Sequence, residues 1–177
     1  MSLKKVSVEL QGITPLLMHR YPTIPIEAPE KKSPSEQAEL SAYRDPHSGD
    51  LYIPAVAIQR ALVGGAGYVR GKGRGSLAKV AAACLMVSPE YVSLGTKTFE
   101  VDARPVVIAA TKGRIVRYRA RLDSWKVLFL LEYDETLLSA KELRAIADAT
   151  VSRVGLLDFR PAKGGSFGRS MIVSWKD

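Results

Sequence analysis

Cations, phenylalanines and glycines are concentrated in one stretch near the end of the chain, from Gly155 to Arg169. Glycine permits positive φ angles and lets a backbone approach a partner closely. Free N–H groups in such a loop bind anions, and aromatic rings provide faces on which bases stack. This composition favours contact with a phosphate backbone, and a plain glycine-rich connection beside a sheet edge is the alternative. The candidate contact residues here are Phe159, Arg160, Lys163, Gly164, Gly165, Phe167 and Arg169.

A second cationic pattern lies in a predicted strand, where Arg117, Arg119 and Arg121 alternate with other residues. Alternate residues of a strand project from one face. At a rise of about 3.3 Å per residue, the three guanidinium groups form a row spaced by about 6.6 Å, near the phosphate spacing of an extended single strand. The row is expected to extend into the preceding turn. The alternative is a solvated strand face whose charges prevent pairing with the edge of another sheet. The candidates in this region are Lys112, Arg114, Arg117, Tyr118 (for base stacking), Arg119 and Arg121.

A third cationic stretch alternates with glycine over residues 70–75 and contains no acid. Such a segment can follow a phosphate backbone with little obstruction from side chains, and a flexible linker has a similar composition. The spacing does not match a P-loop. The candidates are Arg70, Lys72, Arg74 and Lys79.

Signals for catalysis are few. His19, which follows the first predicted strand, is a weak candidate for a general acid or base in RNA cleavage. A histidine that lies on the surface or contacts a phosphate is the favoured interpretation. The chain has one other histidine, His47, and no metal-ligand spacing, catalytic triad or paired-carboxylate motif. We therefore predict no cofactor and no metal.

The net charge of +8 is concentrated in the middle of the chain: residues 55–133 hold thirteen cations and five anions. A localised basic excess is typical of proteins that bind polyanions. The single cysteine, Cys84, lies among apolar residues and rules out an internal disulfide. No apolar run is long enough to span a membrane, and no signal-peptide core follows Met1. These features predict an intracellular, cytoplasmic protein that does not bind membranes.

The hydrophobic pattern predicts one α+β domain over residues 1–177. A strand is expected over 4–18, followed by a proline-rich insertion or arm over 20–54. Within this insertion we expect a short helix over 36–43 and a short strand over 51–53. Helices are expected from Pro54 and over 77–85, strands over 99–110, 114–122 and 125–133, a helix after Ser139, and a last strand over 171–175. Without the insertion the order is β-α-β-β-α-β, a ferredoxin-like, RRM-like sheet with helices on one face.

This order, the glycine-rich loop before the last strand and the segment Gly12-Ile-Thr-Pro-Leu-Leu17 together resemble the repeat-associated (RAMP) RNA-binding superfamily of CRISPR systems. The likeness is to the backbone subunits of multi-subunit effector complexes. It implies copies that assemble side by side along RNA or single-stranded DNA, with Arg160, Lys163 and Arg169 near the backbone. The chain is shorter than typical backbone subunits, which favours a small relative, of a kind that phages encode, acting alone.

The sequence thus predicts a protein that binds single-stranded nucleic acid with little sequence preference, as a homo-oligomer or filament. Two alternatives remain open. One is an endoribonuclease of the same superfamily that uses His19. The other is a structural or interaction protein whose basic face binds an acidic protein partner.

Overall fold

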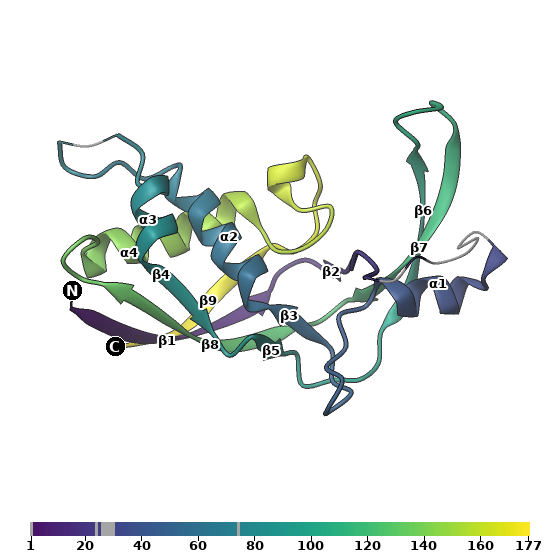
Figure 1. The fold of residues 1–177 in the computed structure, drawn as a ribbon, viewed down its shortest axis with the longest axis horizontal. Helices are drawn as coiled ribbons and strands as arrows, with labels where there is room; N and C mark the ends of the chain where they lie inside the picture. The colour runs from purple at the N-terminus through teal and green to yellow at the C-terminus, as the bar shows by residue number, and fades with distance from the viewer. Residues whose placement is uncertain (1, 24, 26–30, 74) are drawn as a thin grey trace.

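Alternating apolar residues build the main sheet of the protein, whose computed structural model describes residues 2–23, 25, 31–73 and 75–177. Val6, Val8 and Leu10 of the first strand are buried between more exposed neighbours. The sheet is antiparallel, with the order β4-β8-β1-β9. Helices α2 and α4 lie against one of its faces (Figure 1), so the chain is an α+β protein. The bounds of these elements are β1 Leu3–Gly12, β4 Leu85–Ser88, β8 Lys126–Asp134, β9 Ser170–Lys176, α2 Ala55–Ala66 and α4 Ala140–Ala149.

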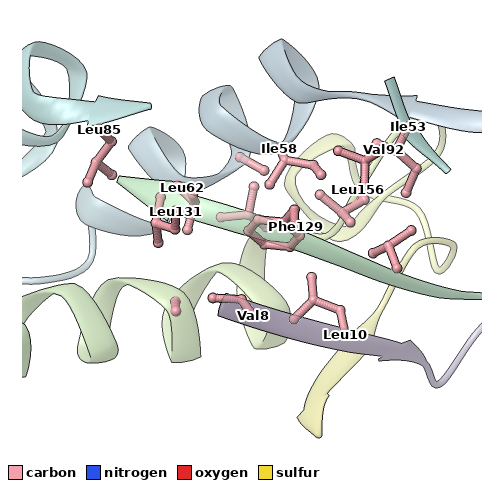
Figure 2. Close-up of a cluster of buried hydrophobic side chains, with 14 of the residues drawn as sticks. Val8, Leu10, Ile53, Ile58, Leu62, Leu85, Val92, Phe129, Leu131 and Leu156 are labelled. Atoms are coloured by element: carbon pink, nitrogen blue, oxygen red, sulfur yellow. The ribbon is translucent and has the colours of Figure 1, made fainter. Parts of the chain in front are cut away.

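The hydrophobic core fills the space between this sheet and α2, where Ile58 and Leu62 meet Phe129 and Leu131 (Figure 2). Strand β8 lies between two neighbours, as expected, but only one of its faces is covered. Its apolar run suggests burial on both sides, whereas Leu128 and Leu130 are 60% and 43% exposed. The opposite face of the sheet therefore carries apolar side chains in contact with solvent.

A second sheet, with the order β2-β7-β6, carries a long hairpin away from the main body (Figure 1). The predicted strand over 4–18 is divided between the two sheets. At the break, a Cβ on Gly12 would lie only 2.2 Å from Trp125 Nε1, and the same Nε1–H donates to Thr14 O at 2.8 Å. The tryptophan therefore fixes the point at which the chain leaves the main sheet. The bounds are β2 Leu16–Leu17, β6 Glu100–Val107 and β7 Arg114–Leu122.

The predicted insertion contains α1 (Pro34–Ser41), which packs against β7. The helix begins two residues before its predicted start, because Ser33 and Glu36 form a reciprocal capping box. The insertion ends in β3 (Tyr52–Pro54), which pairs with β5 (Tyr91–Ser93) to form a two-stranded ribbon.

Two local boundaries differ from the sequence pattern. Helix α3 (Ala78–Cys84) ends before Leu85, which pairs with Tyr133 as the first residue of β4, a strand that the sequence analysis missed. After α4 the chain continues as a π-helix, η2 (Thr150–Val154), which ends at Gly155 with φ of 72°. A 3₁₀ turn, η3 (Pro161–Lys163), lies inside the glycine-rich loop.

Within the described ranges, no helix is both long and apolar enough to cross a membrane.

Candidate nucleic-acid interface

The glycine-rich loop, residues 155–169, is hydrogen-bonded to β2 and to the residue before it. Asp158 N–H donates to Leu17 O at 3.0 Å, and Gly168 N–H donates to Pro15 O at 2.8 Å. Gly165 and Phe167 donate to carbonyl groups within the loop. The glycine-rich composition predicts free N–H groups here for anions, and at these four positions that prediction is wrong. The donors are occupied because the loop packs on the body and must satisfy its own backbone.

Asp158 joins the loop to strand β7. Its Oδ2 lies 2.6 Å from Arg119 Nη1 and 3.7 Å from His19 Nδ1. The Arg119 side chain is only 11% exposed. This arginine therefore holds the loop in place, in addition to any contact with a ligand.

Arg104 and Asp102 make a second junction between the loop and the hairpin. The Arg104 guanidinium lies 4.5 Å from the ring centre of Phe167 and 5.5 Å from that of Phe159. Asp102 pairs with both Arg104 and Arg121. Phe167 is 6% exposed, so its ring offers little free surface to a base in this structure. Phe159 is 40% exposed and keeps part of its ring free.

The arginine row is present on one face of β7, but its members differ in their partners. Arg119 pairs with Asp158, and Arg121 pairs with Asp123 and Asp102. Arg117 is exposed, and among the described residues it has no ion-pair or hydrogen-bond partner. Arg114 lies opposite Val107 and, three residues before Arg117, projects from the other face of the hairpin. The row therefore does not extend through Arg114.

Two neighbouring cavities share His19. One, of about 550 Å³, lies between the segment after β2, α1 and β7. The other, of about 360 Å³, lies between the first turns of α2 and the glycine-rich loop. We call the two together the His19 cleft. Its charged and aromatic lining residues are His19, Arg20, Tyr21, Tyr43, Arg60, Arg117, Tyr118, Arg119, Asp158 and Arg160.

The cleft is strongly cationic. Arg20, Arg60, Arg117, Arg119 and Arg160 face one carboxylate among the described lining residues, and this carboxylate already pairs with Arg119. The Nε atoms of two of these arginines, Arg119 and Arg160, are buried and lack a hydrogen-bond partner within the described chain. Buried donors of this kind are commonly satisfied by water or an anion.

His19 is half-exposed at the point where the two cavities meet. Burial, followed by the charge of Arg119, lowers its pKa below the ordinary value of 6.5, although Asp158 opposes the shift. The ring is therefore mostly neutral at pH 7 in the free protein. A neutral imidazole beside a carboxylate can accept a proton from a hydroxyl or become a further cation when a polyanion binds.

Other predicted contact residues lie away from this cleft. The loop over 70–75 and α3, which carries Lys79, lie at the end of the molecule opposite the hairpin (Figure 1); Arg70 and Lys72 are exposed there, and Arg74 falls outside the described residues. Lys112 is exposed in the hairpin turn. Lys163 and Gly164 are exposed at the outer side of the glycine-rich loop, and Arg169 Nη1 donates to Ser152 O.

Three residues of the cleft were not predicted from the sequence: Arg20, Arg60 and Tyr43. Arg60 is exposed on α2, a helix whose start the sequence does predict. Its nearness to Pro54 is the one signal in the sequence that could have assigned Arg60 to the cleft. Arg20 and Tyr43 come from the proline-rich insertion, and nothing in their spacing relates them to the loop at residues 155–169.

Comparison with known proteins adds no family assignment. No model of a protein family matches this chain, and a search of curated proteins found no match.

Proposed function

We propose that this protein binds single-stranded nucleic acid in the His19 cleft. The observation that carries the proposal is the convergence of five arginines from four separate segments on a cleft with one lining carboxylate among the described residues. Clustered arginines neutralise phosphates and release counterions. Contacts between arginine and phosphate position a strand without reading its bases, which favours binding with little sequence preference.

The arrangement of the main sheet supports the finer fold assignment. Helix α2 lies between β1 and β4 in the chain, and α4 lies between β8 and β9, so two β-α-β halves meet at the antiparallel pair β4–β8. We therefore propose a ferredoxin-like β-α-β-β-α-β arrangement, with the hairpin, α1 and the β3–β5 ribbon as additions. The assignment agrees with the likeness to the repeat-associated RNA-binding superfamily.

Assembly of several copies along one strand is part of the proposal. Two separate surfaces expose apolar side chains without a covering element among the described residues. One is the outer face of the main sheet, with Leu128 and Leu130, and the other is the hairpin, with Val107 and Val116. Two different apolar surfaces on one chain favour head-to-tail contacts, which build rings or filaments. Light scattering with and without an oligonucleotide tests this expectation.

The proposal is tested by titrating a fluorescent 20-nucleotide strand with wild type and with the double variant Arg60→Gln/Arg117→Gln. Both arginines are exposed, and neither forms an ion pair with another described residue. Each lost phosphate contact lowers the slope of log affinity against log salt by about 0.7 for a single strand, so the double variant is expected to lose about 1.4. The control is Lys141→Gln/Lys176→Gln, which removes two exposed charges outside the cleft. Absence of wild-type binding at low salt would overturn the proposal and favour an acidic protein as partner.

A second candidate function, RNA cleavage, is favoured by one observation, the neutral His19 beside Asp158 in the cleft. In this function His19 takes the proton from a 2′-hydroxyl as that oxygen attacks the adjacent phosphorus, and the 5′-oxygen leaves with a proton from water. The test is incubation of labelled RNA with wild type and His19→Ala. Cleavage by both proteins, or by neither, removes this candidate.

A further inference from the structure

Three tyrosines form a continuous aromatic cluster beside the His19 cleft. The ring centres of Tyr43 and Tyr52 are 5.8 Å apart, and those of Tyr52 and Tyr91 are 4.5 Å apart. The β3–β5 ribbon explains their placement. Ile53 and Val92 are fully buried on the inner side, so Tyr52 and Tyr91, their neighbours in the chain, stand on the outer side. All three tyrosines are partly exposed.

The cluster is continuous with the cleft. Tyr43 lines the 360 Å³ cavity together with His19 and Arg60, and Pro54, the register partner of Tyr91, lines the same cavity. Desolvation raises the pKa of both Tyr43 and Tyr52, and the positive charge of Arg20 acts on both in the opposite direction. A cation of the cleft therefore lies close to the tyrosine rings.

We infer that Tyr43, Tyr52 and Tyr91 are a platform on which bases stack as the strand passes out of the His19 cleft over the β3–β5 ribbon. The inference rests on the proposed function and adds a path and a base contact to it. Every base has a π-face, so stacking on tyrosine binds a strand without selecting its sequence. The rings already pack against one another, and little side-chain freedom remains to be lost when a base arrives.

The charges at the cleft end of the cluster favour a nucleic acid as its occupant. The cavity that Tyr43 lines also contains Arg60 and Arg160, and its one described carboxylate, Asp158, already pairs with Arg119. At the ribbon end the charge of Glu90 acts on Tyr52, so phosphates are expected at the cavity and uncharged bases at the ribbon. A strand whose phosphates lie in that cavity places its next bases near the β3–β5 ribbon.

The experiment compares Tyr52→Leu and Tyr91→Leu with wild type in binding a 20-nucleotide poly-U strand at several salt concentrations. Leucine keeps side-chain bulk and removes the π-face. Each variant is expected to bind about tenfold more weakly, with an unchanged salt slope, because no phosphate contact is lost. Tyr68→Leu is the control: Tyr68 is 56% exposed and packs beside Arg153 just beyond the C-terminal end of α2. Tyr52→Phe keeps the ring and is expected to bind as wild type does.

The possible results separate the two proposals. Equal affinity of wild type and both leucine variants, with folding verified by circular dichroism, overturns the platform and leaves the binding function intact. Absence of wild-type binding overturns both. A leucine variant that binds the strand normally but no longer forms oligomers would identify the cluster as a protein contact, which also overturns the inference. If leucine disturbs the fold, photocrosslinking of 4-thiouridine RNA to the wild type decides, and crosslinks elsewhere than at these tyrosines exclude the platform.

Discussion

Two segments of this chain have similar compositions and different structures. The loop over 155–169 and the loop over 70–75 both combine glycines with arginine and lysine. The first donates hydrogen bonds to Leu17 and Pro15 and lines the His19 cleft. The second lies at the end of the molecule opposite the hairpin (Figure 1), and its described residues make local contacts such as the bridge between Arg70 and Ser76.

The glycines of the two loops show the physical basis of this difference. A Cβ at Gly165 would lie 1.8 Å from Phe159 O, and one at Gly168 would lie 2.0 Å from Leu156 O. At Gly73 and Gly75 a Cβ would meet nothing within 4 Å. Glycine is therefore required by close packing at Gly165 and Gly168, whereas Gly73 and Gly75 face open space. Segments of similar composition therefore form a packed wall of the His19 cleft in one place and an exposed loop in the other.

The largest expected effect is that of alanine at Gly168, where φ is +68° and the added Cβ meets a backbone oxygen. We expect Gly168→Ala to lower the free energy of unfolding by about 3 kcal/mol, because it combines strain with a clash. Gly75→Ala is expected to change it by less than about 0.5 kcal/mol. Urea denaturation measures both. A similar loss in the two variants would contradict the contrast between the loops.

The next effect concerns the junction of the first loop with β7. Asp158→Ala leaves Arg119 largely buried and without its carboxylate partner. We expect the free energy of unfolding to fall by about 1–2 kcal/mol. This loss is smaller than for a fully buried pair because Asp158 is partly exposed. The matched control is Asp148→Ala, which breaks an exposed pair with Arg144 on α4. The temperature of thermal unfolding should fall clearly for the first variant only. Equal shifts in the two variants would show that the pair between Asp158 and Arg119 does not stabilise the fold more than an exposed pair does.

A smaller effect separates the two loops in binding. Arg160 lines the cleft and Lys72 lies in the distant loop. We expect Arg160→Gln to weaken single-strand binding by about fivefold, since one phosphate contact is lost. Lys72→Gln should change affinity by less than about twofold under the same conditions. Fluorescence anisotropy measures both, and a stronger effect at Lys72 would place the strand on the other loop.

The smallest expected effect is a dependence on pH through His19. Its pKa is lowered from 6.5 in the free protein, so the ring is neutral at pH 7.5 and gains a proton as the pH falls through and below 6.5. Phosphates stabilise the protonated ring, and affinity should rise by about twofold between pH 7.5 and 5.5. His19→Gln should abolish this rise.

Stability should change in the opposite direction. Because the folded pKa of His19 is depressed, the unfolded chain takes up the proton more readily. This group therefore makes the fold slightly less stable as the pH falls below 6.5. Urea midpoints of wild type and His19→Gln at pH 7.5 and 5.5 measure this effect on stability. If the wild type gained more stability than His19→Gln as the pH falls, the lowered pKa of His19 would be contradicted.

Local patterns in the sequence were sufficient to predict part of this structure. The alternation at 117–121 places three arginines on one face of β7, as observed. Ser139 caps α4 in a capping box with Glu142. Thr111–Gly113 turns the hairpin, with Lys112 at φ of 57°. Each of these depends on residues within a few positions of one another.

The parts that could not be predicted depend on contacts between distant segments. Asp158 and Arg119 are separated by 39 positions, and no spacing relates them. The same holds for Arg104 with Phe167, and for the carbonyl groups that occupy the N–H groups of the glycine-rich loop. A cation in the sequence does not show whether it will meet a carboxylate of its own chain, which is why Arg117 and Arg121 looked equivalent before the fold was known.

The π-helical turn at Thr150–Val154 makes the position of the glycine-rich loop tolerant of a change in chain length. A π turn holds about one residue more than an α turn. Removal of one residue from this turn would let the ordinary helix continue, with the loop close to its present place. Removal of one residue from α4 itself would instead rotate everything that follows by about 100° and shift it by about 1.5 Å, and Asp158 would be drawn away from Arg119 and His19. Relatives that lose a residue within 150–154 would therefore keep the shape of the cleft, whereas relatives that lose one within α4 would not.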